Sequence, residues 1–287
     1  HRDLHRVVRL QRQMCISARS DAEMHEYIDY TLELVLSGTL TEIEKPSPVL
    51  IKPRVLEIGC GTGLLMYNLI NRCESYVGTD LSDVVINRLT HQVSPDNGLQ
   101  GSDVDGKTTL YCREAINFSG FEEASFDRLM LCSVVQYFPS LEYLTQTLEQ
   151  AVRVVADGGK IIVGDVRNYA LLRAYHTSIE LFQATDGTET VALETGVAEK
   201  SLREQELAID PSWFLFLPEL IPSINFVEVL PKRGKLQNEM TRFRYDVVLH
   251  INSRTTNVDV EWQEWSHEKS TVDEIKQRLT ETTSSTL

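Results

Sequence analysis

Short apolar runs alternate with amphipathic stretches through the middle of the chain. Strands of the buried type are predicted at residues 54–58, 76–79, 109–113, 126–132 and 160–165. Helices are predicted between them at 64–72, 83–92 and 141–155, with a turn at 157–159. Strands that alternate with helices are typical of parallel βαβ units. The pattern therefore predicts an α/β fold with a doubly wound, mostly parallel sheet.

Helical segments flank this core on both sides. Residues 1–20 carry arginines at helical spacing, and a second helix is predicted over residues 22–36 with Asp21 as its N-cap. Residues 167–209 are polar and mainly helical in pattern. We expect these helices to form a lid over the core.

The end of the chain returns to strand patterning. Two late strands are predicted at 226–230 and 242–251, joined by a basic loop, which indicates an antiparallel pair at the sheet edge. From residue 252 on the chain is polar, with a short helix predicted at 271–280.

The composition is that of an ordinary globular protein. The 287 residues are 42% hydrophobic and 24% charged, which suffices for a core without disulfides. No apolar run approaches the ~18 residues that span a bilayer, and no N-terminal stretch has the order of a signal peptide. The five cysteines form no Cys-x-x-Cys pair, so we expect reduced thiols and no metal site. We expect a cytoplasmic protein without a membrane partner.

The net charge and the first residue of the chain bear on its partners and on its extent. A formal net charge of −14 argues against nucleic acid as the main partner, because phosphate binding needs a basic surface. The chain starts at His1 rather than at Met, and we expect it to be a fragment of a longer chain.

A glycine-rich turn follows the first predicted strand. Gly59, Gly61 and Gly63 are spaced as G-x-G-x-G between that strand and the next helix, and Glu57 precedes them. Glycines allow a sharp strand-to-helix turn and a close approach of a ligand to the backbone. The spacing differs from the G-x-G-x-x-G of dinucleotide sites, where a glutamate beside a pyrophosphate is poorly suited. The loop is therefore a candidate nucleotide site of another kind.

A carboxylate ends the second predicted strand. Asp80 lies about 20 residues after the first glycine, where an acidic side chain can accept both hydroxyls of an adenosine ribose. A surface aspartate at a strand end is the alternative, but the glycine loop favours ribose binding.

Together these residues resemble the class I methyltransferases that use S-adenosylmethionine (SAM) and release S-adenosylhomocysteine. The resemblance implies a Rossmann-like sheet whose glycine loop passes under the methionine moiety of SAM, while Asp80 holds the ribose. Carboxylates also attract the sulfonium cation. The SAM-binding residues that the resemblance implies are Glu57, Gly59, Gly61, Gly63, Asp80, Leu81, Glu114, Ala115, Ile116, Ser133 and Tyr27.

Three later segments indicate a particular group within this family. Residues 132–140, 164–167 and 231–248 resemble methyltransferase domains embedded in nonribosomal peptide synthetases and polyketide synthases. The likeness runs from about residue 24 to residue 278. It implies neighbouring synthase domains and an acyl or peptidyl carrier protein whose phosphopantetheine presents the substrate.

The segment that ends in His176 resembles the O-methylating branch, in which a His–Glu pair removes the hydroxyl proton. An alcohol benefits from a positioned base, and histidine held by a carboxylate is the usual one. His176 and Glu239 are therefore the expected catalytic pair, acting on a hydroxyl that belongs to a β-hydroxyacyl thioester. Gln136, Tyr137 and Arg167 are the candidates for the acceptor pocket.

Other readings stay open. N-methylation of an aminoacyl or peptidyl thioester, C-methylation of a polyketide, and a non-catalytic SAM-binding scaffold are the alternatives. His176 could also be a structural histidine, and Glu239 a loop residue paired with Arg242 or Arg244.

The resemblance implies five segments. They are an N-terminal helical lid (1–48), the SAM-binding core (49–169), a helical insert for the acceptor (170–215), the terminal antiparallel strands (216–252) and a polar C-terminal segment (253–287). The basic face of residues 1–20 and the basic loop at 232–235 are candidates for docking an acidic carrier protein. Solvated surface charge is the alternative.

Overall fold

The computed structural model describes residues 20–37, 52–93, 107–253, 271–274 and 276–277. Residues 1–254 and 255–287 form two separate units, and each is described by itself. In the second unit, residues 272–274 and 276–277 are helical. The arginine-bearing stretch at 1–19 and the segment at 94–106 lie outside the described residues. No described helix combines the length and the apolar character needed to cross a bilayer.

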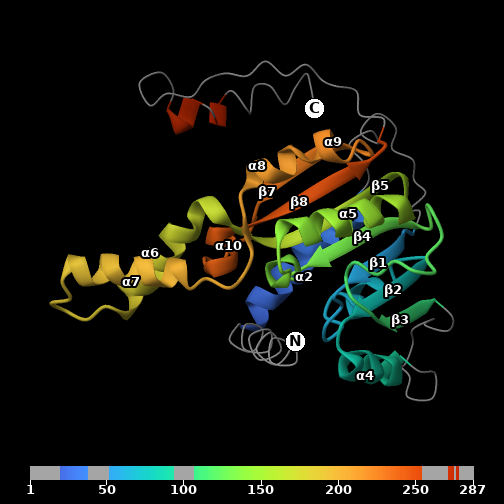
Figure 1. The fold of residues 1–287 in the computed structure, drawn as a ribbon, viewed down its shortest axis with the longest axis horizontal. Coiled ribbons are helices and arrows are strands. Elements are labelled where there is room, and N and C mark those ends of the chain that lie inside the picture. Colours follow the sequence, from blue (N-terminus) through green and yellow to red (C-terminus); the bar gives the residue numbers. More distant parts are fainter. Residues whose placement is uncertain (1–19, 38–51, 94–106, 254–270, 275, 278–287) are drawn as a thin grey trace. The chain divides into compact units, whose positions relative to one another are not determined.

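Eight strands of the described residues form one sheet (Figure 1). They are β1 (Arg54–Ile58), β2 (Ser75–Asp80), β3 (Thr108–Cys112), β4 (Phe126–Cys132), β5 (Val155–Asn168), β6 (Ala208–Ile209), β7 (Ile224–Pro231) and β8 (Arg244–Ile251). The order is β3-β2-β1-β4-β5-β8-β7, and β6 pairs with β5. Strands β1 to β5 pair in parallel, whereas β8 runs antiparallel to both β5 and β7. The predicted doubly wound, mostly parallel sheet is confirmed.

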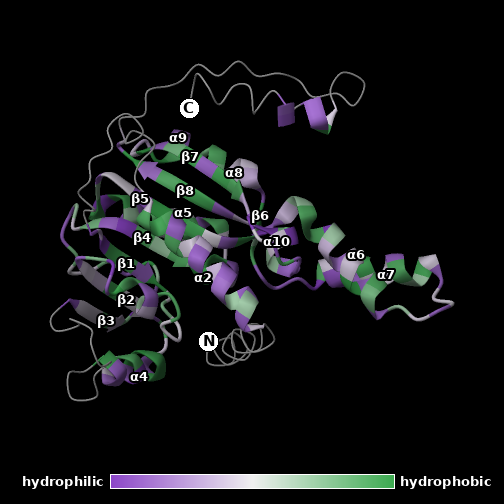
Figure 2. Cartoon of the chain, turned by 180° about the vertical axis from the view of Figure 1, so that it is seen from behind, coloured by the Kyte–Doolittle hydropathy of each residue, from purple (hydrophilic) through white to green (hydrophobic). Residues whose placement is uncertain are grey.

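The central strands of the sheet are buried on both faces, as β4 illustrates. Leu129 and Leu131 pack in one apolar cluster, while Met130 and Cys132 alternate into the other. Full burial of one such leucine stabilises the fold by about 1.5–3 kcal/mol. Hydrophobic residues are mixed with hydrophilic ones along the strands in Figure 2. The unbroken apolar run at residues 129–132 is therefore the expected pattern for this part of the strand.

Helices line the two clusters. The first contains residues from α5 (Leu141–Val154), α8 (Pro211–Leu215) and α9 (Leu217–Leu220). The second contains residues from α2 (Asp21–Leu36), α3 (Met66–Leu69) and α4 (Asp83–Val93). Amphipathic helices thus cover a sheet that is apolar on both sides.

Two helices project away from the sheet (Figure 1). They are α6 (Leu172–Gln183) and α7 (Thr190–Leu202), which follow the 3-10 turn η4 (Tyr169–Leu171). Nζ of Lys200 lies 2.7 Å from Oε1 of Glu180, which ties the two helices together. We call this helix pair the α6–α7 arm; it falls within the predicted insert at 170–215.

Three local predictions are wrong. The N-cap of α2 is Ser20 rather than Asp21, because Ser20 and Glu23 exchange hydrogen bonds in a capping box. The helix predicted at 64–72 shortens to α3, with turns on either side. The turn predicted at 157–159 lies inside β5, where Gly158 takes a φ of 76° without interrupting the strand.

Candidate active site

The topology creates one site at the carboxyl edge of the sheet. From β1 the chain builds outward through β2 and β3, and it then crosses to β4 on the other side of β1. Ligands of open α/β sheets bind outside the strand ends at such a switch point. The glycine loop follows β1, Asp80 ends β2, and Ser133 follows β4, so these predicted residues share one edge.

The glycine loop needs its glycines. Gly59, Gly61 and Gly63 have φ values of 77°, 53° and 82°, in the left-handed region that residues with a Cβ rarely adopt. A Cβ on Gly63 would also lie 2.8 Å from Cδ2 of Leu89. The backbone N–H groups of Gly59 and Cys60 donate to the carbonyl of Thr79, at 2.7 and 2.9 Å. These bonds fix the loop against the end of β2.

Asp80 is built into the same loop. Its Oδ2 accepts the Gly61 N–H at 2.9 Å, and its Oδ1 accepts the Ser82 N–H at 2.9 Å. The residue is only 6% exposed. The two backbone bonds therefore hold the carboxylate rigidly at the end of β2.

Glu57 lies beneath the loop on β1. The hydroxyl of Tyr76 on the adjacent strand β2 donates to its Oε2, and both residues are buried. Burial, with Glu57 as a further cause, raises the pKa of Tyr76 well above its ordinary value. Tyr76 therefore stays a neutral donor and fixes the direction of the Glu57 carboxylate.

The residues predicted beside an adenine lie after β3 and β2. Glu114 is exposed, while Ala115 and Ile116 are half-buried in the turn that follows β3. Leu81 is 50% exposed directly after Asp80. An exposed apolar side chain next to a carboxylate suits a flat, partly apolar ligand.

Ser133 and Asp165 meet at the ends of neighbouring strands. The Ser133 hydroxyl donates to Oδ2 of Asp165 at 2.7 Å, and the Tyr27 hydroxyl lies 3.4 Å from the same serine oxygen. Ser133 and Asp165 have φ values of 54° and 67°. Such backbone costs about 1–3 kcal/mol per residue and clusters at functional sites.

Two buried cations compensate these carboxylates. Arg244 Nη1 donates to Oδ2 of Asp165 at 2.9 Å, and Lys232 Nζ lies 3.6 Å from its Oδ1. Lys232 also pairs with Asp246 at 2.7 Å, and the Asp246 carboxylate accepts the Asp165 N–H at 2.7 Å. Burial lowers the pKa of Lys232, but Asp246 and Asp165 outweigh it and raise that pKa. The cluster is thus a closed ionic network beside the glycine loop.

The helix α2 is fastened to this network. Lys232 Nζ lies 5.3 Å from the ring centroid of Tyr27. Glu26 accepts the backbone N–H of Lys235 at 2.6 Å, and Glu23 accepts from the Asn238 amide at 2.8 Å. The N-terminal helix therefore holds the loop between β7 and β8 at the site.

The comparison with known families agrees with this geometry. Residues 56–163 match a family described as "Methyltransferase domain", a stretch that runs from β1 through β5 and includes the glycine loop, Asp80 and Ser133. The chain contains a class I SAM-dependent methyltransferase domain. SAM is its cofactor.

The methyltransferase domain is similar to segments of large synthases. It is 37% identical over 262 residues to chondramide synthase cmdD of Chondromyces crocatus, covering 91% of this chain and 6% of that protein. It is 34% identical over 239 residues to nonribosomal peptide synthetase TES of Alternaria alternata, covering 83% of this chain and 4% of that protein. The chain thus spans less than a tenth of the length of these relatives.

Solved structures share the fold. The N-methyltransferase NodS of Bradyrhizobium japonicum, in complex with S-adenosylhomocysteine, superposes with a TM-score of 0.51 at 15% identity, covering 81% of this chain and 89% of NodS. The methyltransferase domain of bacterial-CtHen1-CN has the same TM-score at 14% identity, covering 79% of this chain and 98% of that one. At these identities the likeness shows the class I fold alone.

His176 lies on α6 at the base of the α6–α7 arm, and its carboxylate partner is not the predicted one. Its Nε2 lies 3.3 Å from Oε2 of Glu204, and the side chain is 7% exposed. Arg167, at the end of β5, lies 3.4 Å from the same carboxylate oxygen and pairs with Glu206 at 2.6 Å. Burial lowers the pKa of His176 and outweighs the opposing effect of Glu204. The imidazole is therefore neutral at pH 7.

Glu239 lies in the other cluster, so the expected His176–Glu239 pair is not the pair that the structure forms. It begins the short helix α10 (Glu239–Phe243), whose N-cap is Asn238. Its Oε1 accepts from Nε and Nη2 of Arg244 at 2.9 and 2.6 Å. The reason is local: Arg244 follows five residues on and reaches back to it. The alternative reading of Glu239 as the partner of Arg244 describes this contact.

The three candidates for the acceptor pocket lie in two different places. Gln136 and Tyr137 lie on the 3-10 turn η3 (Val135–Tyr137), which begins two residues after Ser133. Gln136 is 2% exposed, and its carbonyl accepts the Leu207 N–H at 2.8 Å. Arg167 is engaged with two glutamates and stacks over Tyr175 at 4.6 Å. Tyr137 is half-buried and lies four residues after Ser133. Arg167 instead anchors the α6–α7 arm.

The basic loop at residues 232–235 is less exposed than predicted. Lys232 was expected to offer surface charge to a carrier protein, but its side chain is 6% exposed and ion-paired within the network. Burial of two nearby carboxylates explains this, since each requires a compensating cation. Of the predicted docking loop, Arg233 and Lys235 remain exposed.

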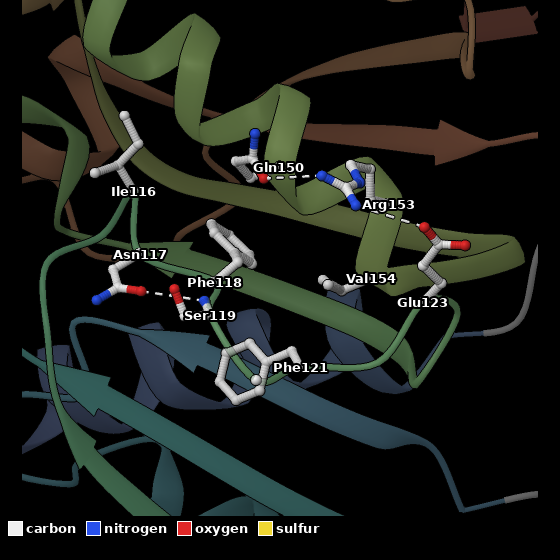
Figure 3. Close-up of a pocket in the computed structure, with 10 residues that line it drawn as sticks. Ile116, Asn117, Phe118, Ser119, Phe121, Glu123, Gln150, Arg153 and Val154 are labelled. Atoms are coloured by element: carbon white, nitrogen blue, oxygen red, sulfur yellow. Dashed lines mark hydrogen bonds and ion pairs between the residues drawn. The ribbon is translucent and has the colours of Figure 1, made fainter.

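A separate cavity of about 370 Å³ lies between the turn after β3 and α5 (Figure 3). Its polar wall carries Arg153, which lies 3.5 Å from both Gln150 and Glu123. Ile116 is the lining residue that it shares with the predicted SAM site. None of the glycine-loop residues, Asp80 or Ser133 lines the cavity, which is therefore a different feature from the site at the switch point. Among the described residues, no cluster of three or more ligating side chains could hold a metal ion.

Sequence reasoning missed the residues that complete both clusters. Asp165 could have been found, because it lies near the end of a parallel strand, as Asp80 does. Asp246, Arg244 and Glu204 carried no such signal. Their partners are remote in sequence or their positions depend on packing.

Proposed function

We propose that this domain transfers the methyl group of SAM to the amino nitrogen of an amino acid or peptide held as a thioester on a carrier protein. The observation that carries the proposal is the similarity to nonribosomal peptide synthetases over most of this chain. Every building block of a peptide brings an amino nitrogen. The carrier protein and the neighbouring synthase domains are part of the same proposal.

SAM is proposed to bind along the carboxyl edge of the sheet. The glycine loop and Glu57 would hold its methionine end, Asp80 its ribose, and Leu81 with residues 114–116 its adenine. The left-handed glycines and the two backbone bonds that fix Asp80 support this placement. Ser133 would then lie on the methyl side, because β4 is adjacent to β1.

The chemistry makes modest demands on the protein. The lone pair of a neutral amine attacks the methyl carbon, the C–N bond forms as the C–S bond breaks, and S-adenosylhomocysteine leaves. The nitrogen then releases its extra proton to water. An α-amino group has a pKa of about 7.7–8.0, so a sizeable neutral fraction exists at pH 7. Alignment and exclusion of water supply most of the rate.

O-methylation is the second candidate, and one observation favours it. His176 is buried and neutral, as a general base must be, and Glu204 lies where an orienting carboxylate would be needed. In that reading Glu204 replaces Glu239 as the partner of His176. The ion pairs of Glu204 and Glu206 with Arg167 favour an anchoring role instead.

The test is methyl transfer from isotopically labelled SAM to two carrier-bound thioesters, one aminoacyl and one β-hydroxyacyl. The proposal expects label in the aminoacyl substrate. Label in the hydroxyacyl substrate alone would overturn it and favour O-methylation. The substrates should be presented on a carrier protein from a peptide synthetase, so that docking does not limit the comparison.

A further inference from the structure

Ser133 and Asp165 are matched across two strands. The register pairs Cys132, the last residue of β4, with Gly164 of β5, and Ser133 and Asp165 are the residues that follow this pair. Both next residues are left-handed and neither is a glycine. The Ser133 N–H donates to the Gly164 carbonyl at 3.1 Å, which fixes the serine from the backbone side. Two adjacent unusual conformations thus hold one hydroxyl at the carboxyl edge of the sheet.

The direction of that hydroxyl is determined by its partner. A serine hydroxyl carries one proton, and at 2.7 Å this proton lies on Oδ2 of Asp165. The serine oxygen can then offer only lone pairs to other groups. The Tyr27 hydroxyl, 3.4 Å away, can approach it only as a donor. One lone pair of Ser133 remains for a ligand.

Asp165 itself is closed to solvent. It is 1% exposed, and Arg244 and Lys232 flank its two oxygens. A ligand therefore cannot reach the carboxylate directly, whereas Ser133 is half-buried and follows β4 at the edge that carries the glycine loop. Of the partners of Asp165, Ser133 is the one that follows β4 at this edge and can pass its effect to a ligand.

We propose that Asp165 is a positioning residue that makes the Ser133 oxygen a hydrogen-bond acceptor for the N–H of the substrate amine. This rests on the proposed N-methylation. The hydrogen bond orients the nitrogen so that its lone pair faces the methyl group of SAM. No proton is transferred to Ser133, and the bonds made and broken remain those of methyl transfer. The specificity is for an acceptor whose nucleophilic atom still carries a hydrogen to donate.

The experiment compares Ser133→Ala, Asp165→Asn and the double variant, using a carrier-bound aminoacyl thioester and labelled SAM. Each single variant should lose about 10- to 100-fold in kcat, the range of a hydrogen bond to a charged or charging group. SAM affinity, measured by calorimetry, should change by less than about twofold. Because Asp165 acts through Ser133, the double variant should be no slower than the slower single variant.

Ser140→Ala is the matched control, since Ser140 caps α5 by accepting the Tyr143 N–H. It should lower stability but leave kcat within about twofold. If Asp165→Asn fails to fold, Ser133→Gly serves instead: it relieves the left-handed backbone and removes the hydroxyl, and it should lose as much rate as Ser133→Ala.

Wild-type kcat in the Ser133 variants, or losses that multiply in the double variant, would overturn the inference. Either result leaves N-methylation standing if the native protein labels the amine. Failure of the native protein to label the amine would instead remove the proposed function and the inference with it.

Discussion

The imidazole of His176 and the carboxylate of Glu204 face each other, with Nε2 3.3 Å from Oε2. The contact joins α6 to the segment that follows α7, and Arg167 binds the same carboxylate from the end of β5. One glutamate thus connects the base of the α6–α7 arm to the sheet. We expect His176 to hold the arm rather than to move a proton.

Replacement of His176 separates these roles. His176→Gln keeps a polar side chain of similar reach, so an anchoring role predicts kcat within about threefold of the native value on an aminoacyl substrate. Loss of a general base would cost ~10²–10⁴-fold. Single-turnover transfer of labelled methyl measures the difference, and a loss of two orders of magnitude would restore His176 as a base.

The same histidine gives a pH signature in stability. Burial lowers its pKa below 6.5 in the folded chain, so the unfolded chain takes up the proton first as the pH falls. Stability from this group is present above about pH 6.5 and is lost between that pH and the lower folded-state pKa. Urea unfolding at about pH 7.5 and 5.5 should show a larger loss for the native protein than for His176→Gln. Equal losses would contradict the shift.

Asp80 should control SAM affinity. Asp80→Ala removes the ribose acceptor and both bonds to the loop, at Gly61 and Ser82. We expect the Kd for SAM to rise about 10-fold or more, the range for a lost hydrogen bond to a charged group. Asp83→Ala, at an exposed carboxylate in the first turn of α4, is the control and should leave the Kd within about twofold. Similar effects of both would remove the assignment of Asp80.

Gly63 and Gly158 offer a matched pair for the glycine loop. Both have left-handed φ, 82° and 76°, but a Cβ on Gly63 would lie 2.8 Å from Leu89 while one on Gly158 meets open space. Gly158→Ala should lower the free energy of unfolding by about 1–2 kcal/mol from backbone strain alone. Gly63→Ala should cost about 1–3 kcal/mol more, because the side chains around it must shift. Chemical denaturation measures both, and equal losses would show that the loop is not tightly packed.

The sheet and the cofactor loop could be predicted from the sequence because their signals are local. Residues 129–132 form a continuous apolar run, and the same run is the buried part of β4, which packs on both faces of the sheet. The spacing of the glycines predicts the turn. The left-handed φ values of Gly59, Gly61 and Gly63 explain why glycine is needed there. Asp80 follows from the position of a strand end. Each of these depends on residues close together in the chain.

The acceptor side could not be predicted in the same way. The resemblance paired His176 with Glu239, but short-range contacts prevail: Arg244 binds Glu239 from five residues away. Glu204 reaches His176 only because α7 folds back along α6. The sequence predicted that Lys232 would be a surface charge. It is buried instead, because Asp165 and Asp246 need a compensating cation. Long-range compensation of buried charge leaves no pattern in the sequence.

The most direct test uses one acceptor that carries both nucleophiles. A carrier-bound thioester of a β-hydroxy-α-amino acid, incubated with labelled SAM and the native protein, can be methylated on nitrogen or on oxygen, and fragment masses locate the label. Our account predicts label on nitrogen, with S-adenosylhomocysteine formed in equal amount. Label on oxygen would contradict it and would make His176 with Glu204 the catalytic pair.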